Sequence, residues 1–113
     1  MKINTKRLAL LAYYLPSVPP EEFNIVSWRK CAIGWATKVP EFVKLGFYMD
    51  ENNPITPVYH SYENWKAVQK FFGLSESEAN YLFSMYKYNY SPYVSPIFVA
   101  RRIKKFIKTN KEV

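Results

Sequence analysis

The sequence predicts a mainly α-helical fold: one compact domain over residues 1–113, with five or six helices and a short β-hairpin or ordered loop over 47–59. Apolar residues recur every three or four positions along most of the chain, which is the spacing of one helix face. Serine or asparagine caps and proline or glycine stops flank these segments. A length of 113 residues is also close to the commonest size of a single domain.

The N-terminal segment predicts a helix that begins at a cap on Asn4 or Thr5 and ends at Leu15, since its leucines fall at helical spacing. Pro16 cannot continue that helix. Residues 16–22 carry three prolines, and a proline also disfavours helical backbone in the residue before it. We therefore expect an extended connector there.

Residues 23–38 combine aromatic and aliphatic side chains with few helix breakers and predict a second helical region, capped by Asn24. Gly34 lies inside it, where glycine costs about 1 kcal/mol relative to alanine. Ala32 and Ala36 flank this glycine with similarly small side chains. We expect another helix to approach the bare backbone closely at this point.

The next two elements are a short helix and the hairpin. Pro40 suits the first turn of a helix, and Gly46 suits its end. Over 47–59, apolar residues stand on both sides of a polar turn, a pattern that favours a hairpin. Pro54 and Pro57 argue against a long second strand.

Three further helices complete the prediction. Ser61 is expected to cap the first of them and Gly73 to end it. Ser75–Glu78 is a Ser-x-x-Glu sequence, the capping-box pattern in which each side chain binds a free backbone N–H, so a new helix should begin there. Ser95 and Pro96 predict the cap and the first residue of the last helix.

Charge and cysteine content restrict the classes of function. The net charge of +7 favours an anionic partner such as a nucleic acid, a nucleotide, an acidic protein or a membrane surface. A single cysteine excludes an intramolecular disulfide and fits a reducing cytosol. The apolar stretch 8–15 lacks the cleavage site of a signal peptide, and no apolar run approaches the roughly 18 to 20 residues that cross a bilayer. We expect a cytoplasmic protein without a membrane span.

The last helix carries most of the excess charge, because residues 94–113 hold six Lys or Arg and one Glu. Four of these cations fall at i, i+3, i+4 and i+7 and form what we call the basic stripe, opposite an apolar face with Val99 and Ile103. Tyrosines are frequent in residues 86–93, which are expected to form a loop just before this helix. The basic stripe consists of Arg101, Lys104, Lys105 and Lys108, and the candidate partner-binding residues are these four with Arg102, Tyr88, Tyr90 and Tyr93.

Three interpretations of this helix remain open. A solvated face with lysines near the C-terminus, where the helix dipole favours cations, needs no ligand at all. Alternatively the stripe attracts phosphates, and the tyrosines offer rings on which bases stack. A membrane-surface function is weaker, because the apolar face is needed for the core.

Catalysis is disfavoured by the residue types. His60 is the only histidine and lies next to a predicted helix start, where capping or packing is the more common use. Cys31 lies among small residues, where a buried cysteine behaves as a small hydrophobe. One Cys and one His make no zinc set, the Asp50–Glu51 pair is too sparse for a calcium loop, and no glycine-rich phosphate loop is present. We expect no cofactor and no metal, and an enzyme centred on His60 or Cys31 is the less favoured alternative.

Two strings together resemble a known family. Residues 31–36 read Cys-Ala-Ile-Gly-Trp-Ala, and residues 71–75 read Phe-Phe-Gly-Leu-Ser, followed by Leu82 and Phe83. They are similar to small uncharacterised bacterial and bacteriophage proteins with a Cys-x-x-Gly-[Trp/His]-Ala helix and a Phe-Phe-Gly-Leu-Ser junction before Leu-Phe. The similarity covers about residues 8–106. Many members have a second cysteine in a Cys-Gly-Thr context, where this chain has Trp-Arg-Lys at 28–30, so a paired-cysteine function does not carry over.

The resemblance implies a compact helical fold and a phage or prophage origin, but no assigned activity or functional residues. Small phage proteins often sequester a host protein or a nucleotide signal used in defence. The expected function is therefore a non-catalytic accessory factor in the host cytoplasm that engages an acidic host protein or a nucleotide. Nucleic-acid binding is the alternative, and the sequence leaves the oligomeric state open.

Overall fold

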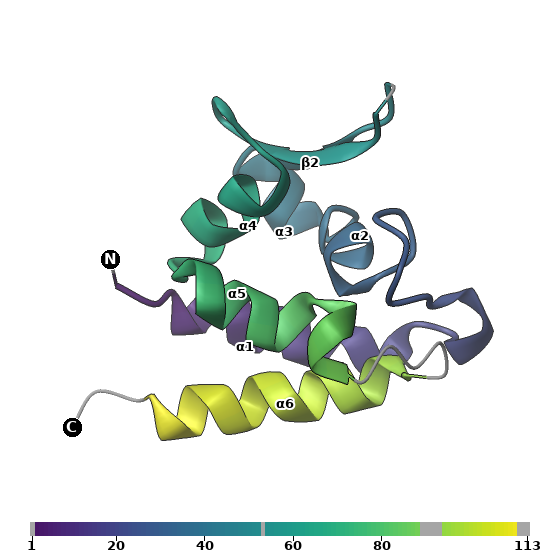
Figure 1. The fold of residues 1–113 in the computed structure, drawn as a ribbon, viewed down its shortest axis with the longest axis vertical. Coiled ribbons are helices and arrows are strands. Elements are labelled where there is room, and N and C mark those ends of the chain that lie inside the picture. Colours follow the sequence, from purple (N-terminus) through teal and green to yellow (C-terminus); the bar gives the residue numbers. More distant parts are fainter. Residues whose placement is uncertain (1, 53, 89–93, 111–113) are drawn as a thin grey trace.

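The computed structural model describes residues 2–52, 54–88 and 94–110, and it shows a mainly helical chain with a small antiparallel sheet (Figure 1). Helix α6 lies along one side of the molecule and the sheet along the opposite side, with the other helices between them. The predicted fold class is confirmed. In chain order the elements are α1 (Thr5–Tyr14), η1 (Leu15–Ser17), η2 (Pro20–Glu22), α2 (Ala32–Ala36), α3 (Pro40–Lys44), β1 (Phe47–Asp50), β2 (Thr56–Tyr59), β3 (Tyr62–Glu63), α4 (Asn64–Phe72), α5 (Glu76–Phe83), η3 (Met85–Tyr88) and α6 (Pro96–Thr109).

Helix α1 begins where the sequence predicts, because the Asn4 side chain accepts a hydrogen bond from the Arg7 backbone N–H at 3.0 Å. The prediction of an extended connector over 16–22 is wrong, since this segment forms most of two 3-10 turns, η1 and η2. A proline stands in the first turn of each. There its fixed φ suits the turn and its missing N–H is not needed.

The prediction of a helical region over 23–38 is wrong in its first half, because α2 begins only at Ala32. Asn24 does not cap a helix. Its side chain accepts the Val26 N–H at 3.0 Å, and its own backbone N–H donates to the Lys30 carbonyl at 2.9 Å. Asparagine side chains compete with helices for backbone groups in this way, and the local bonds fold residues 24–31 into consecutive turns.

Gly34 does permit a close approach, but the neighbour differs from the predicted one. An added Cβ at Gly34 would collide with the backbone of Trp28 and Arg29, in the turns that precede α2. The neighbour of Gly34 is therefore not another helix. It is the irregular segment that precedes α2 in the chain. The requirement for glycine is the same, because the contact is with backbone atoms.

The predicted hairpin is confirmed, since β1 and β2 pair antiparallel with Phe47 opposite Tyr59. The third strand, β3, was not predicted. The chain turns sharply at His60, which has a φ of +56°, and brings Tyr62 opposite Tyr59. His60 therefore occupies a turn between two strands, whereas the sequence placed it next to a helix start.

The start of α4 also differs from the prediction. Ser61 does not cap this helix, because the two residues after it belong to β3 and the helix begins at Asn64. The Thr56 hydroxyl on β2 accepts the Asn64 backbone N–H at 2.9 Å instead. A side chain from the neighbouring strand thus satisfies one of the free N–H groups at the helix N-terminus.

The junction between α4 and α5 follows the sequence prediction. Gly73 ends α4 in the left-handed conformation with a φ of +68°. The Ser75 side chain accepts the Glu78 N–H at 3.2 Å, and the Glu78 carboxylate accepts the Ser75 N–H at 2.8 Å. Both halves of the capping box are present.

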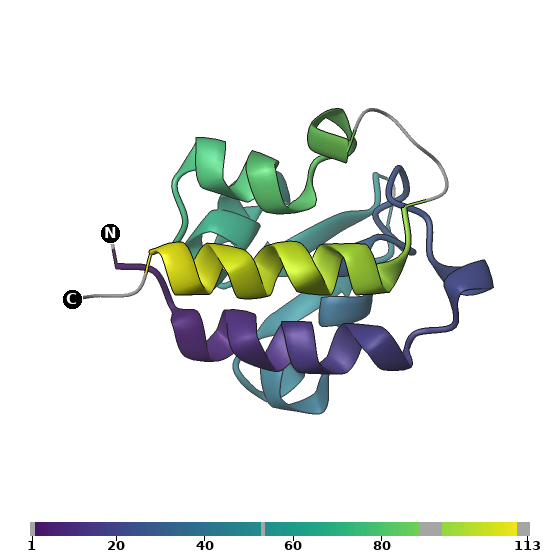
Figure 2. The same ribbon diagram turned by 90° about the horizontal axis from the view of Figure 1, so that it is seen from below.

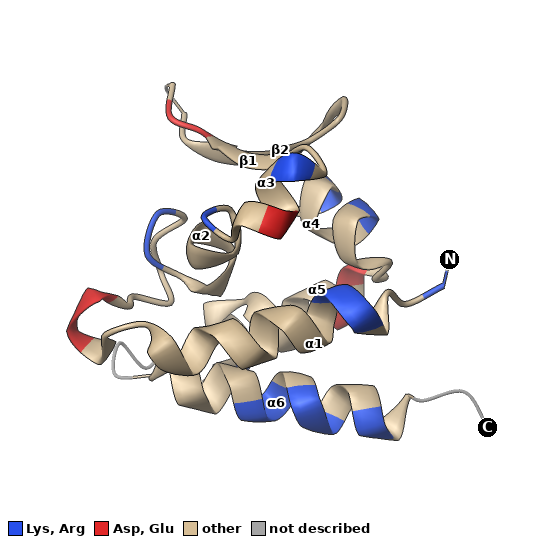
Figure 3. Ribbon diagram, turned by 180° about the vertical axis from the view of Figure 1, so that it is seen from behind, with Lys and Arg blue, Asp and Glu red and all other residues tan. Residues whose placement is uncertain are grey.

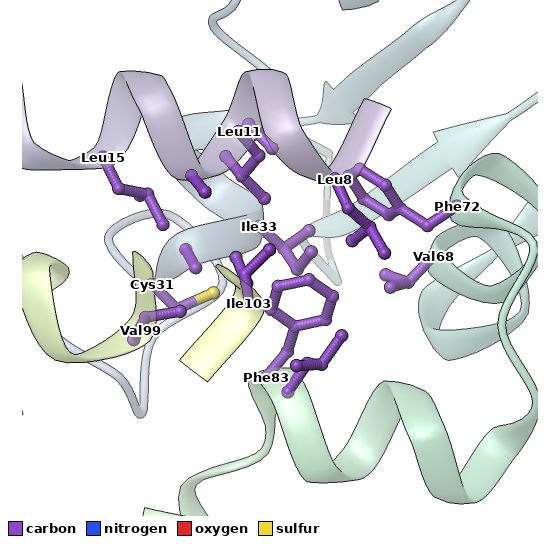
Figure 4. Packing of buried hydrophobic residues seen from close by; sticks show 14 of the residues in the cluster. Leu8, Leu11, Leu15, Cys31, Ile33, Val68, Phe72, Phe83, Val99 and Ile103 are labelled. Atoms are coloured by element: carbon purple, nitrogen blue, oxygen red, sulfur yellow. The ribbon is translucent and has the colours of Figure 1, made fainter. Parts of the chain in front are cut away.

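One cluster of buried apolar side chains joins the helices to each other (Figure 4). Near the sheet, Phe47 of β1 stacks on Phe71 of α4 with the ring centroids 4.3 Å apart. On the other side of the cluster, α6 contributes residues that pack against α1 and α5. Fully or almost fully buried members shown in Figure 4 are Leu8, Leu11, Leu15, Ile33, Val68, Phe72, Phe83, Val99 and Ile103.

Candidate functional site

Helix α6 is held in place from both its start and its buried face. The Ser95 side chain accepts the Phe98 N–H at 3.3 Å, and Pro96 occupies the first turn, as predicted. The face with Val99, Ile103 and the 8%-exposed Phe106 packs into the core. This fixes which side of the helix faces solvent.

The basic stripe lies on that solvent side. Figure 3 shows Lys and Arg recurring along α6, a helix whose sequence contains no Asp or Glu. All four side chains of the stripe are exposed, and none is paired with a carboxylate of the described residues. In the described part of the chain the one ion pair joins Arg29 to Glu51 at 3.0 Å, on the β1 side of the molecule. The four charges are therefore available to a partner.

Exposed apolar side chains lie at the N-terminal end of α6 and at the neighbouring end of α1, and they were not predicted from the sequence. Ile97 and Phe98, at the N-terminal end of α6, are 44% and 60% exposed. Helix α1 runs antiparallel beside α6 (Figure 2), which brings Tyr13, near the C-terminal end of α1, to the same end of the pair. Tyr13 is 82% exposed, the highest value among the large apolar side chains described. We call Tyr13, Ile97 and Phe98 the apolar edge.

A signal for part of this edge was present in the sequence. Phe98 stands three residues before Arg101 and Ile97 four residues before it, so both fall on the polar side of the helical wheel. Contiguous apolar residues on the solvated side of a helix indicate a contact surface, whereas single ones do not. Tyr13 could not be added from the sequence, because its place depends on how α1 packs against α6.

Unlike the four side chains of the basic stripe, those of Arg102 and Tyr88 make polar contacts within the described part of the protein. The Arg102 guanidinium lies 3.9 Å from the Tyr88 ring centroid, and its Nη1 donates to the carbonyls of Tyr81 and Lys87 at 3.0 and 2.9 Å. Tyr88 is buried, and its hydroxyl donates to the Leu82 carbonyl at 2.7 Å. Burial raises the pKa of the Tyr88 hydroxyl well above its usual value. This ring is covered by Arg102 and is not open to stacking by a base.

The other two tyrosines of the sequence prediction, Tyr90 and Tyr93, lie outside the described residues. Residues 86–88, the start of the expected loop, belong to the 3-10 turn η3. The candidate site that can be described in the structure therefore consists of the basic stripe and the apolar edge.

The two residues considered for catalysis lie in different surroundings. Cys31 is buried beside Val99 in the core (Figure 4), and its thiol makes a long 3.8 Å contact to the Trp28 carbonyl. His60 is exposed at the turn between β2 and β3, with its ring 4.1 Å from that of Tyr59. Across the described residues, no three His, Cys, Asp or Glu side chains gather into a potential metal site. None of the helices described has both the length and the apolar character needed to cross a bilayer.

The buried environment of Cys31 changes the acidity of its thiol. Burial raises the pKa of the Cys31 thiol from 9.0 to about 11, and the backbone groups around it oppose this only in part. The folded chain thus holds the thiol proton more tightly than the unfolded chain. The stability that this neutral thiol contributes is complete below pH 9 and is lost as the pH rises through about 11.

We expect the stability advantage of the parent over Cys31→Ala to shrink by about 2 kcal/mol between pH 8 and about pH 11. Urea unfolding of both proteins at several pH values measures this difference. Lysine and tyrosine ionisation is common to the two proteins and cancels. A difference that stays constant with pH would mean that the thiol is not buried in solution.

Comparisons of the chain with models of known protein families, with curated proteins and with solved structures find no match. The resemblance noted in the sequence analysis stays a prediction.

Proposed function

We propose that the chain is a non-catalytic binding protein that engages an acidic protein partner through the basic stripe and the apolar edge. The observation that carries this proposal is that Arg101, Lys104, Lys105 and Lys108 are exposed and have no carboxylate partner among the described residues, on the same helix as the exposed Ile97 and Phe98. From Phe98 to Lys108 the surface extends about 15 Å along the helix, at 1.5 Å per residue. This length suits an amphipathic segment of a partner.

Two features favour a protein over a nucleic acid as the partner. Protein interfaces are enriched in aromatic side chains and arginine at their centres, and a hot spot commonly contains both. The exposed aliphatic side chain of Ile97 adds nothing to the attraction of phosphates, but it fits an apolar anchor of a protein. The resemblance to bacteriophage proteins extends the proposal to an accessory factor that targets a host or defence component in the bacterial cytoplasm.

The test uses a variant that removes the four charges of the stripe. In the quadruple Gln variant of Arg101, Lys104, Lys105 and Lys108 we expect affinity for an acidic partner to fall at least tenfold, because each charge is exposed and has no carboxylate partner in the described part of the chain. The probe is a fluorescein-labelled helical peptide with Glu on one side and Leu and Phe on the other, measured by anisotropy. Thermal melting should stay close to that of the parent, since exposed substitutions change stability by about 0.5 kcal/mol or less.

A matched control distinguishes a loss of affinity caused by the stripe from one caused by the lower net charge of the protein. Lys30, Lys44, Lys66 and Lys87 are also exposed, and changing all four to Gln removes the same charge from other parts of the surface. This control should bind the peptide within about threefold of the parent. Equal losses in the two variants would reduce the effect to net charge and would contradict the proposal.

The apolar edge is tested by Phe98→Ala. We expect about a fivefold loss of affinity for the peptide and little change for a labelled 20-nucleotide single strand, whose attraction to the surface is mainly electrostatic. Tighter binding of the oligonucleotide than of the peptide, with a steep dependence on salt and on the stripe, would replace the protein partner by a nucleic acid.

A further inference from the structure

A cavity on another part of the molecule is not used by the proposed function. It lies between the turns of residues 25–31, Trp65 of α4 and the C-terminal end of α5 with η3, and its volume is about 260 Å³. An apolar cavity of about 150 Å³ is enough to bind benzene, and sites for drug-sized ligands begin at about 300 Å³. The cavity is thus of the size for a single ring or two fused rings.

Its walls suit a flat aromatic ligand. The Trp28 and Trp65 rings are in contact, with centroids 5.1 Å apart and planes inclined by 55°. Phe83 and Met85 line the cavity as well. Aromatic and thioether groups contact the face or edge of a ring favourably, and ring stacking contributes to binding of every base type.

Polar groups with unused hydrogen-bonding capacity also line the cavity. Within the described residues, neither the Asn80 amide nor the Ser27 hydroxyl makes a side-chain hydrogen bond. The Ser84 hydroxyl accepts the Tyr86 N–H at 3.3 Å, and its own proton has no acceptor among the same residues. Together they offer donors and acceptors to a ligand whose rings lie on the tryptophans.

The charges narrow the class of ligand further. None of the described residues that line the cavity is Lys, Arg, Asp or Glu, which favours a neutral group as its occupant. A phenyl ring would fit the walls but would make no hydrogen bond to the Asn80 amide. A nucleobase is flat and neutral, and its edge presents both donors and acceptors.

We propose that this cavity binds the base of a nucleoside or nucleotide, with the ring against Trp28 and Trp65 and its polar edge at Asn80. The site is separate from the basic stripe, and the proposal goes beyond the proposed function and does not depend on it. It also gives a use to the two sequence strings, because Cys31 of the first and Phe83 of the second both line the cavity.

The test titrates the protein with adenosine, guanosine, cytidine and uridine, which are uncharged at pH 7. Trp28 and Trp65 line the cavity and Trp35 does not, so the indole N–H signals in ¹H–¹⁵N spectra report on the site with an internal reference. We expect at least one nucleoside to shift the Trp28 and Trp65 signals in a saturable way, with a Kd on the order of 0.1 mM for a ligand of this size. The quadruple Gln variant of the stripe should bind it equally well.

The decisive variant is Asn80→Ala. Alanine favours helix, so α5 should remain folded, and we expect about a tenfold loss of affinity from the missing amide. Asn52→Ala, at an exposed position after β1, is the matched control and should bind like the parent. Absence of any nucleoside-induced shift at millimolar concentration, or an affinity that Asn80→Ala leaves unchanged, would overturn the proposal. Saturable binding of N-acetyltryptophanamide without binding of a nucleoside would also overturn it, in favour of a protein side chain.

Discussion

Replacing Gly34 with alanine is expected to lower the free energy of unfolding by about 3 kcal/mol or more. In a helix this substitution normally stabilises by about 1 kcal/mol, because alanine has the higher helix propensity. At Gly34 the added Cβ would collide with backbone atoms of Trp28 and Arg29. Backbone atoms cannot move aside as the end of a flexible side chain can, so α2 and the turns before it would have to separate.

Gly46→Ala is the control for this experiment, with urea unfolding as the measurement. Gly46 has a φ of +93°, but the nearest atom to an added Cβ there is Cε1 of His60, at an ordinary 4.0 Å. The cost should be only that of a left-handed backbone, about 1 to 2 kcal/mol. If Gly34→Ala were as stable as the parent, the turns of residues 28 and 29 would not lie against α2.

The parts of the fold that the sequence predicted well are those determined by local chemistry. The capping box of Ser75 and Glu78, the left-handed stop at Gly73 and the Ser95 cap depend on residues within one turn of each other. Both hydrogen-bonding partners of each signal lie within that turn, so no distant contact is needed to form it. The end of α4 and the starts of α5 and α6 lie where these signals predict them.

The errors occurred where distant contacts decide the local structure. Residues 24–31 have helical composition, but Asn24 closes a turn with Val26 and the segment packs on Gly34. Tyr62 pairs with Tyr59 as a strand, and Thr56 replaces Ser61 as the partner of the α4 N-terminus. Propensity is a weak indicator whenever tertiary contacts offer an alternative.

In the candidate site, too, the sequence predicted the features set by local chemistry and not those set by distant contacts. The wheel placed the basic stripe on one side of α6, because helical periodicity is a local property. The wheel could not show that Arg102 is bound within the protein while Arg101 makes no ion pair with the described residues. Arg102 donates to carbonyls of α5 and η3, and these elements pack on only one edge of the helix. For the same reason the cavity beside Trp28 could not be predicted, as its walls come from three separate segments of the chain.

The two neighbouring arginines of α6 are therefore expected to respond differently to the same substitution. Arg102→Met should lower the free energy of unfolding by about 2 to 3 kcal/mol. It removes the two hydrogen bonds to the carbonyls of Tyr81 and Lys87 and the guanidinium over the Tyr88 ring, while methionine keeps the apolar stem. These contacts join α6 to η3 and the end of α5, so their loss should loosen η3 in particular.

Arg101→Met is the matched control, because its guanidinium is exposed and makes no ion pair with the described residues. Its stability should stay within about 0.5 kcal/mol of the parent, and its affinity for the acidic peptide should fall. Urea unfolding of the two variants tests how α6 stabilises the fold, and peptide anisotropy with the same variants tests how it binds a partner. Equal destabilisation by the two variants would mean that Arg102 does not hold η3 in place, and an unchanged affinity of Arg101→Met would remove Arg101 from the binding surface.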